Sequence, residues 1–346
     1  MKQLIEASQK DRELLFRDVG LKLNIPFSMI EKDFWVCFVL NCIFSNDELC
    51  QAFRFKGGTS LSKGYGLIKR FSEDLDLVLD KTLILGNEDI FKSSNSQQKI
   101  FAEIVDKKAS DYISTTIKTK IKDVLNDFVK IYTDEEYCEV NPKYQPKNID
   151  NKLLHIVYPK SNKNEYLRPD ILLEIGIMSA RTPFENKQIT PYILDAFPNL
   201  DIRAINVPTV MPKRTFWDKA TILHREHYRS EKTKTPERYS RHYYDLFQMG
   251  HSFVKELALQ DKSLLADVVN RKDKLYHCPW ARYEDCLVGK FKLLPNENNV
   301  EHIERDYSAM QQMIFSEQKI EWQKIIDYLS LLECEINSNI TLNLQT

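Results

Sequence analysis

Two aspartates, Asp74 and Asp76, are separated by one leucine in the segment RFSEDLDLVLD. Acidic and apolar residues alternate there, which is the pattern of a β-strand. Residues two apart in a strand point to the same side, so the two carboxylates should project together. Adjacent carboxylates repel each other in a low dielectric unless a cation lies between them. Because Mg2+ often combines one or two carboxylates with phosphate oxygens, the pair predicts a metal site that binds a phosphate compound.

A glycine-rich segment, FRFKGGTSLSKGYG, precedes this strand and holds four of the nine glycines of the chain. Gly57 and Gly58 allow the backbone to turn tightly and to approach a phosphate. Thr59 and Ser60 can supply hydroxyl donors, and a helix that follows them would favour anions at its N-terminus. An ordinary turn and a solvated acidic strand are the alternatives for each motif alone. The two motifs together, with Asp74 15 positions after Thr59, are more specific.

A third carboxylate is expected on a neighbouring strand. The run LRPDILLEIGI is β-rich, and Glu174 is the single acid in its apolar end. An ionised carboxylate among isoleucines and leucines is costly unless it is paired or bound to a metal. Asp170 competes for this role, but it follows Pro169 near the start of the strand, where solvation is easier. We therefore favour Glu174 as the metal-facing residue, with an exposed position on the sheet as its alternative.

Helices and strands must position these groups in the N-terminal part of the chain. Residues 1–50 and 88–131 carry apolar side chains at helical spacing. The S-x-x-E sequence at 28–31 has the form of a capping box and predicts a helix start. Residues 152–159 and 165–178 are β-rich, and the SNKN sequence between them predicts a hairpin turn. We therefore predict an α+β arrangement, with helices flanking a mixed sheet.

The chain from about residue 205 onward is predicted to be helical to its end. Apolar periodicity is clearest over 215–228, 241–257 and 320–332. We therefore predict two domains, an α+β domain over 1–204 and a helical domain over 205–346.

Composition limits the class of protein. The 346 residues are 42% hydrophobic, and 49 Lys and Arg balance 50 Asp and Glu, which excludes a strongly basic nucleic-acid packing protein but allows a local basic groove. The most apolar stretch, 34–44, is too short for a membrane span, and the N-terminus lacks a signal-peptide core. Seven cysteines without CxxC pairs predict reduced thiols in the cytoplasm. Neither a serine-hydrolase elbow nor a P-loop occurs.

Positive charge is concentrated between residues 212 and 241, a segment that contains nine Lys and Arg but only four Asp and Glu. A nucleoside triphosphate or an RNA would be attracted to such a segment. The T-x-x-D sequence at 215–218 has a capping form and would place Lys219 in the first turns of a helix. A cation gains nothing from the helix dipole there, which suggests that Lys219 is held for a ligand such as a triphosphate, with a surface helix of solvated lysines as the alternative. Arg241 and Asp245, four apart, share a helix face and suit an intrahelical ion pair.

These segments resemble the nucleotidyltransferase superfamily related to DNA polymerase beta and, more narrowly, the AbiEii/AbiGii toxin family of type IV toxin–antitoxin and abortive-infection systems. The resemblance rests on IEKDFWVCFVL, FKGGTSLSKGYG, RFSEDLDLVL, PKRTFWDKATILHRE and RYSRHYYDLFQM. It covers most of residues 28–80 and 165–250. The fourth segment corresponds to the one that carries a functional lysine in the family, here Lys219. The fifth corresponds to the one with a functional aspartate, here Asp245, which would orient Lys219 or Arg241 toward phosphates.

The resemblance implies a nucleotidyltransferase-like fold whose helical domain completes the nucleotide site. It also implies transfer of a nucleoside monophosphate from an NTP, such as GTP or a pyrimidine nucleotide, to an RNA such as a tRNA 3′ end, or to a protein. Mg2+ or Mn2+ would be held by Asp74, Asp76 and Glu174. The residues assigned to the nucleotide are Gly57, Gly58, Thr59, Ser60, Lys63 and Arg241.

The resemblance further implies an antitoxin encoded next to this protein that acts without a stable complex, and no membrane partner. The rival hypothesis is a degenerate nucleotidyltransferase fold that serves as a nucleotide- or RNA-binding interaction protein. The retained glycine pair, both aspartates and Lys219 argue against such decay.

Overall fold

The computed structural model describes residues 1–92, 94–160, 167–230, 233, 235–276, 278–315 and 319–344. The chain forms two compact units. The first, called the sheet unit below, comprises Met1–Tyr65, Phe71–Asp89 and Lys99–Val210. The second, called the helical unit, comprises Gly66–Arg70, Ile90–Gln98 and Met211–Thr346. The final crossing from the sheet unit to the helical unit thus falls between Val210 and Met211.

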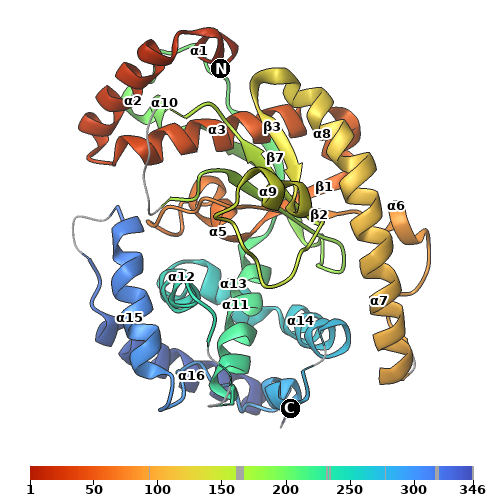
Figure 1. Ribbon diagram of the computed structural model, residues 1–346. Coiled ribbons are helices and arrows are strands. Elements are labelled where there is room, and N and C mark those ends of the chain that lie inside the picture. Colours follow the sequence, from red (N-terminus) through yellow and green to blue (C-terminus); the bar gives the residue numbers. More distant parts are fainter. Residues whose placement is uncertain are drawn as a thin grey trace. The chain divides into compact units, whose positions relative to one another are not determined.

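A mixed seven-stranded sheet is the centre of the sheet unit (Figure 1). Its strands are β1 (Phe53–Lys56), β2 (Leu75–Leu79), β3 (Lys130–Thr133), β4 (Leu153–Val157), β5 (Ile171–Gly176), β6 (Phe184–Ile189) and β7 (Ile205–Val210). Their order is β3-β4-β5-β2-β1-β7-β6. The neighbours β2 and β5 are parallel, as are β1 and β7, and the other neighbours are antiparallel. The predicted mixed sheet is confirmed.

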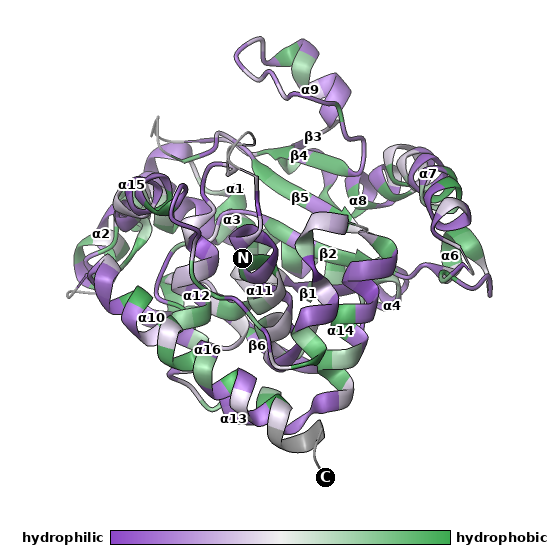
Figure 2. Cartoon of the chain, turned by 90° about the horizontal axis from the view of Figure 1, so that it is seen from below, coloured by the Kyte–Doolittle hydropathy of each residue, from purple (hydrophilic) through white to green (hydrophobic). Residues whose placement is uncertain are grey.

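The central strands are apolar on both faces because helices and loops cover the sheet. Figure 2 shows β4, β5 and β2 side by side and predominantly hydrophobic. In β5, only Glu174 and Gly176 are not buried, and in β2 only Asp76 is not. An acid that interrupts such a strand is therefore an exception to the local pattern. The hairpin predicted between β4 and β5 agrees with their antiparallel pairing, although the SNKN sequence itself lies outside the described residues.

The helices of the sheet unit include the long ones predicted within 1–50 and 88–131 and short ones, at 57–59, 82–85, 134–140 and 193–196, that were not predicted. They are α1 (Lys2–Glu6), α2 (Gln9–Leu23), α3 (Phe27–Phe44), α4 (Asp47–Ala52), α5 (Gly57–Thr59), α6 (Thr82–Leu85), α7 (Asn95–Tyr112, from Lys99 on), α8 (Lys118–Leu125), α9 (Asp134–Val140) and α10 (Ile193–Ala196), with the π-helical turns η1 (Ser60–Gly64) and η2 (Ile113–Ile117) and the 3-10 turn η3 (Asn126–Phe128).

Helix α3 is buried on every side, packed against α2, α8 and β7. It begins at Phe27 after Pro26, and no side chain caps it, so the capping box predicted at 28–31 is wrong.

The helical unit is built around α11 (Pro212–His227). Its other helices are α12 (Ser240–Gly250), α13 (Val254–Gln260), α14 (Lys262–Leu275), α15 (Val300–Met310) and α16 (Trp322–Leu344), with the 3-10 turns η4 (Pro279–Ala281), η5 (Tyr283–Leu287) and η6 (Gln311–Met313). α11 packs against α12, α13 and α14, while α12 packs against α15 and α16. None of the described helices has the length and apolar character needed to cross a bilayer.

Two details of the predicted helical region differ from the structure. Residues 205–210 form strand β7 instead of a helix. The single helix predicted over 241–257 is divided into α12 and α13, and the hydroxyl of Ser252 accepts a hydrogen bond from the amide of Val254 at the start of the second. The predicted α+β class with a helical C-terminal part is nevertheless confirmed.

Candidate active site

The glycine turn and the aspartate strand meet at Gly57 and Asp76. Strand β1 is antiparallel to β2, and their register places Lys56 opposite Asp76. Gly57 follows with a φ of +78°, in the left-handed region that favours glycine. A Cβ atom added to Gly57 would lie 1.8 Å from Oδ2 of Asp76 and 2.5 Å from its Cγ. The backbone of the turn therefore lies directly against the carboxylate, and glycine is required for this approach.

The carboxylate of Asp76 is half-buried and has no hydrogen bond or ion pair with any residue that the structure describes. The ammonium of Lys56, its neighbour in register, donates instead to Oγ of Ser179 at 3.1 Å. Carboxylates in apolar strands are normally paired, because desolvating an ionised group is costly. The carboxylate of Asp76 is thus available to bind a cation supplied from outside the protein.

Glu174 lies beside Asp76 in the sheet, and Asp74 immediately precedes strand β2. The parallel register of β2 and β5 places Glu174 beside Asp76. Asp74 comes two residues before Asp76, one residue outside the strand, so the alternation predicted from the sequence applies within β2 only from Leu75 on. Among the described residues, no three His, Cys, Asp or Glu side chains are close enough together to hold a metal ion. The arrangement suits a cation that shares two carboxylates with phosphate oxygens and water.

Asp170, the competitor for the third carboxylate, is committed elsewhere. It is fully buried, and its Oδ2 lies 2.8 Å from Nδ1 of His155. The other ring nitrogen of His155 lies 3.0 Å from Oδ1 of Asp134. Burial alone would raise the pKa of Asp170, but the hydrogen bond from His155 and the charge of Arg168 lower it. Of the two acids proposed from the sequence, only Glu174 lies beside Asp76.

The hydroxyl groups predicted to meet a phosphate are used within the protein. Thr59 donates to the carbonyl oxygens of Asp74 at 2.6 Å and Ser72 at 3.2 Å. Ser60 donates to the carbonyl oxygen of Gly57 at 2.8 Å. Both side chains are buried. Thr59 therefore fixes the backbone that carries Asp74, which gives it a positioning role rather than the direct phosphate contact expected from the sequence.

Lys63 also has a different partner from the one expected. Its ammonium lies 2.7 Å from Oδ1 of Asp33 and 3.6 Å from the ring centre of Tyr192, and its side chain is buried. Burial would lower the pKa of Lys63, but the charge of Asp33 raises it. Lys63 thus attaches the turn after the glycines to helix α3.

Helix α3 anchors the segment before Asp74 in the same way. Its fully buried Lys32 donates to Oε2 of Glu73 at 2.6 Å and to the carbonyl oxygen of Arg168 at 3.1 Å. Sequence reasoning missed these ion pairs. The signal was present, because Glu31, Lys32 and Asp33 are three consecutive charges within an otherwise apolar helix.

The helical unit contains a buried ion cluster around Asp245. Nε and Nη2 of Arg70 each lie 2.7 Å from one carboxylate oxygen, and Nζ of Lys219 lies 2.7 Å from Oδ2. Lys219 also lies 3.4 Å from Nδ1 of His242. The bidentate partner of Asp245 is therefore Arg70 and not Arg241, the partner considered from the sequence. Arg70 is 175 positions away, and no local pattern indicates it.

Burial and charge act against each other in this cluster. Burial would raise the pKa of Asp245, but Arg70 and Lys219 lower it to about 2, so the carboxylate is ionised. Burial lowers the pKa of Lys219, with Asp245 opposing the shift and Arg70 adding to it. Burial, followed by the charges of Lys219 and Arg241, lowers the pKa of His242 far below its usual value. The ionised carboxylate of Asp245 is thus held between the cations of Arg70 and Lys219.

The position of Lys219 in its helix also differs from the prediction. Helix α11 begins at Pro212, and Met211 is its N-cap residue. Thr215 is therefore inside the helix, and Lys219 lies beyond the first two turns. A proline at the first helical position supplies the start signal that the T-x-x-D sequence was expected to give.

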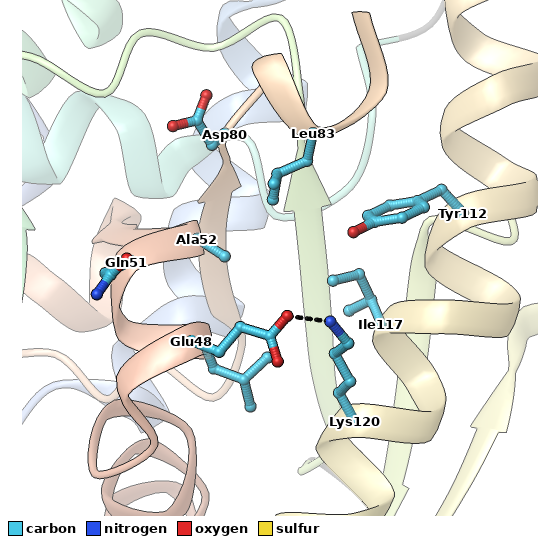
Figure 3. A pocket seen from close by; sticks show the side chains of 9 residues that line it. Glu48, Gln51, Ala52, Asp80, Leu83, Tyr112, Ile117 and Lys120 are labelled. Carbon is cyan, nitrogen blue, oxygen red and sulfur yellow. Dashed lines mark hydrogen bonds and ion pairs between the residues drawn. The ribbon is translucent and has the colours of Figure 1, made fainter. Parts of the chain in front are cut away.

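A pocket of about 190 Å³ lies near the opposite end of β2 and contains none of the predicted site residues. Figure 3 shows Glu48 and Lys120 joined across it, with Tyr112 and Leu83 on its wall. Asp80 at its rim accepts hydrogen bonds from Thr82. The chemistry predicted from the sequence is therefore separate from this pocket.

A family model, the nucleotidyl transferase AbiEii toxin of type IV toxin–antitoxin systems, matches residues 39–328. The chain belongs to this family. The match includes the glycine turn, both aspartates, Glu174, Lys219 and Asp245. The resemblance inferred from the sequence is thus confirmed, and with it membership of a family of nucleotidyltransferase toxins.

Two solved structures are similar to this chain. MenT4, the nucleotidyltransferase toxin Rv2826c from Mycobacterium tuberculosis H37Rv, has 14% sequence identity and a TM-score of 0.43, with 94% of this chain and 97% of that chain covered. JHP933 from Helicobacter pylori has 17% identity and a TM-score of 0.35, with 89% and 97% covered. No curated protein matches the chain.

Proposed function

We propose that this protein is a metal-dependent nucleotidyltransferase toxin that transfers a nucleoside monophosphate from an NTP to an RNA acceptor such as a tRNA 3′ end. The observation that carries the proposal is the carboxylate of Asp76. It is half-buried, lies against the backbone of Gly57 and is unpartnered among the described residues. A protein acceptor is the second arm of the same proposal.

Asp74 and Asp76 would hold a Mg2+ or Mn2+ ion together with oxygens of the triphosphate, and Glu174 would add negative charge beside them. Their donor set fits such an ion, because hard cations take carboxylate and phosphate oxygens. When bound, the ion neutralises charge on the triphosphate and lowers the pKa of an acceptor hydroxyl.

The chain's own groups hold this edge of the sheet in place. Gly57 lets the backbone reach Asp76, and Thr59 fixes the carbonyl of Asp74. Lys32 and Lys63 tie the two segments around the aspartates to α3. Catalysis by positioning and charge neutralisation requires this kind of rigid support.

For the helical unit we propose that Lys219 contributes positive charge to the triphosphate and that Asp245 is a positioning residue. Asp245 accepts one hydrogen bond from Lys219, whose ammonium has three donors. The donors of Lys219 that Asp245 does not use support a contact with a phosphate. In this proposal an antitoxin encoded nearby acts without a stable complex.

The test is incubation with each α-labelled NTP, total tRNA and Mg2+, followed by a gel that separates labelled RNA from labelled protein. Wild-type protein should transfer label, and Asp74→Ala or Asp76→Ala should abolish transfer while the far-ultraviolet circular dichroism is unchanged. Asp80→Asn, which changes a carboxylate just after the far end of β2, is the matched control and should keep its activity. Full activity in both aspartate variants, or no transfer by the wild type with any NTP, contradicts the proposal.

A further inference from the structure

Arg168 is a cation fixed beside the segment that carries Asp74. Its backbone amide donates to Oε2 of Glu73 at 2.8 Å, and its carbonyl accepts from Lys32 at 3.1 Å. Both contacts are partly buried, and both lie within the sheet unit. The position of Arg168 relative to the residue before Asp74 is therefore set by the backbone and not by a flexible loop.

The side chain of Arg168 is held only loosely by its neighbours. Its Nη2 donates to Oδ2 of Asp170 at 3.5 Å, which is long for such a bond. Its Nε is buried and has no partner among the described residues. The guanidinium lies 5.8 Å from the ring centre of Tyr144. The guanidinium thus keeps donor capacity for a bound anion.

Asp170 does not account for this arginine, because its carboxylate is already shared. It lies 2.8 Å from His155 and accepts from the hydroxyl of Tyr137 at 3.3 Å. The charge of Arg168 also acts on Asp74, at the edge of the sheet that carries the candidate active site. Burial would lower the pKa of Arg168, but the charges of Asp170 and then Asp74 raise it. Arg168 is thus a permanent cation within electrostatic reach of Asp74.

We propose that Arg168 binds a phosphate group of the substrate at the carboxylate edge of the sheet unit. Guanidinium groups match phosphate in a bidentate geometry, which a lysine does not reproduce. The side chain is 24% exposed, so it is open to a ligand on one side while Asp170 and Tyr144 hold the other. This inference rests on the proposed function, and the phosphate belongs either to the triphosphate or to the RNA backbone.

The variants Arg168→Gln and Arg168→Lys separate binding from folding. The first removes the charge, and the second keeps the charge near Asp170 but loses the bidentate fork. Arg181→Gln is the matched control, since Arg181 is 21% exposed and pairs with Asp80 beyond the opposite end of β2. Thermal unfolding of all three variants reports on any structural effect.

Steady-state kinetics with a labelled NTP and tRNA then identify the phosphate. We expect Arg168→Gln to raise one of the two KM values by about 10- to 100-fold, the loss of a charge-assisted hydrogen bond, while kcat changes less. Arg168→Lys should recover part of the loss. A raised KM for the NTP assigns the triphosphate, and a raised KM for tRNA assigns the RNA. If both KM values stay within about twofold of the Arg181→Gln control, the inference is wrong.

A binding experiment keeps this inference separate from the proposed function. Inorganic tripolyphosphate with Mg2+ is titrated by calorimetry, and tRNA is titrated by filter binding, against wild type and Arg168→Gln. Binding of either probe that is at least tenfold weaker in the variant supports the role of Arg168 even if no NTP is turned over. Equal binding of both probes by the two proteins, or no binding to the wild type, overturns it.

Discussion

The change of Gly57 to alanine tests whether contact between the glycine turn and Asp76 determines activity. The new Cβ would lie 1.8 Å from Oδ2 of Asp76, whereas real Cβ contacts are not found below 3.0 Å. The carboxylate must therefore retreat by more than about 1 Å. A displacement of that size at a catalytic group reduces the rate about 100-fold. We expect Gly57→Ala to lower kcat/KM for the NTP by at least that factor.

The same change also strains the backbone, and this effect needs its own control. An L-residue at a φ of +78° costs about 1–3 kcal/mol of stability. Gly86 has a φ of +57° and no atom within 4 Å of a Cβ added to it. Gly86→Ala therefore carries the backbone strain without the collision. Both variants should unfold at lower urea concentration, and only Gly57→Ala should lose activity.

The measurement combines urea unfolding with transfer of label from an α-labelled NTP to tRNA. Activity of Gly57→Ala within about threefold of Gly86→Ala would show that the position of the Asp76 carboxylate is unimportant. That result would refute the reasoning that joins the turn and the strand into one site.

Asp245→Asn should lower the free energy of unfolding by about 3–5 kcal/mol at pH 7, because it removes the carboxylate charge that Arg70 and Lys219 share in a buried cluster. The pKa of Asp245 is lowered to about 2 from an unfolded value of about 3.9, so its contribution to the free energy of unfolding is complete above pH 4. The difference in stability between wild type and variant should therefore shrink as the pH falls toward 2, which urea unfolding at pH 7 and pH 3 measures. A difference that does not depend on pH would contradict this prediction. Thr59→Val should cost about 1–2 kcal/mol and reduce kcat/KM about tenfold through the freed carbonyl of Asp74, and wild-type kinetics would remove Thr59 from the positioning role. Glu174→Gln should raise the unfolding temperature in metal-free buffer by relieving repulsion with Asp76, and it should raise the Mg2+ concentration for half-maximal activity about tenfold; an unchanged Mg2+ titration would show that Glu174 does not contribute to the metal site.

The elements that carry the aspartates were predictable because their patterns are local. Alternation around Asp74 and Asp76 identifies β2, and apolar periodicity identifies α3 and the long helices. Strand β7 was missed because Pro208 interrupts it. A proline cannot donate to the ladder, so it argues against a central strand from sequence alone.

The residues that lie beside each charged side chain of the candidate site could be inferred from the sequence only in part. The sequence indicates that Asp76 and Glu174 are both exceptional acids in apolar strands, but their register joins segments almost one hundred residues apart. A lysine after a glycine turn has the same local signature whether it binds phosphate or an internal acid. Lys63 is bound to Asp33, and only the tertiary fold decides between these outcomes.

The pairing of Arg70 with Asp245 is the clearest case of this limit. Each residue has nearer acids or bases in the sequence, and helix spacing favours Arg241 as the partner of Asp245. The bidentate pair instead joins residues 175 positions apart in the sequence. An isolated β-bridge between Arg70 and Ile314 holds the short segment that carries Arg70 within the helical unit.

The central claim is that Asp74 and Asp76 together hold the metal that accompanies the nucleotide. The most direct measurement is a crystal structure with Mn2+ and a non-hydrolysable NTP, with data collected to show anomalous scattering. We expect an anomalous peak about 2.0–2.3 Å from carboxylate oxygens of both aspartates, shared with phosphate oxygens of the nucleotide. A nucleotide bound in the crystal with its Mn2+ held elsewhere, or with the two carboxylates pointing apart, would contradict it.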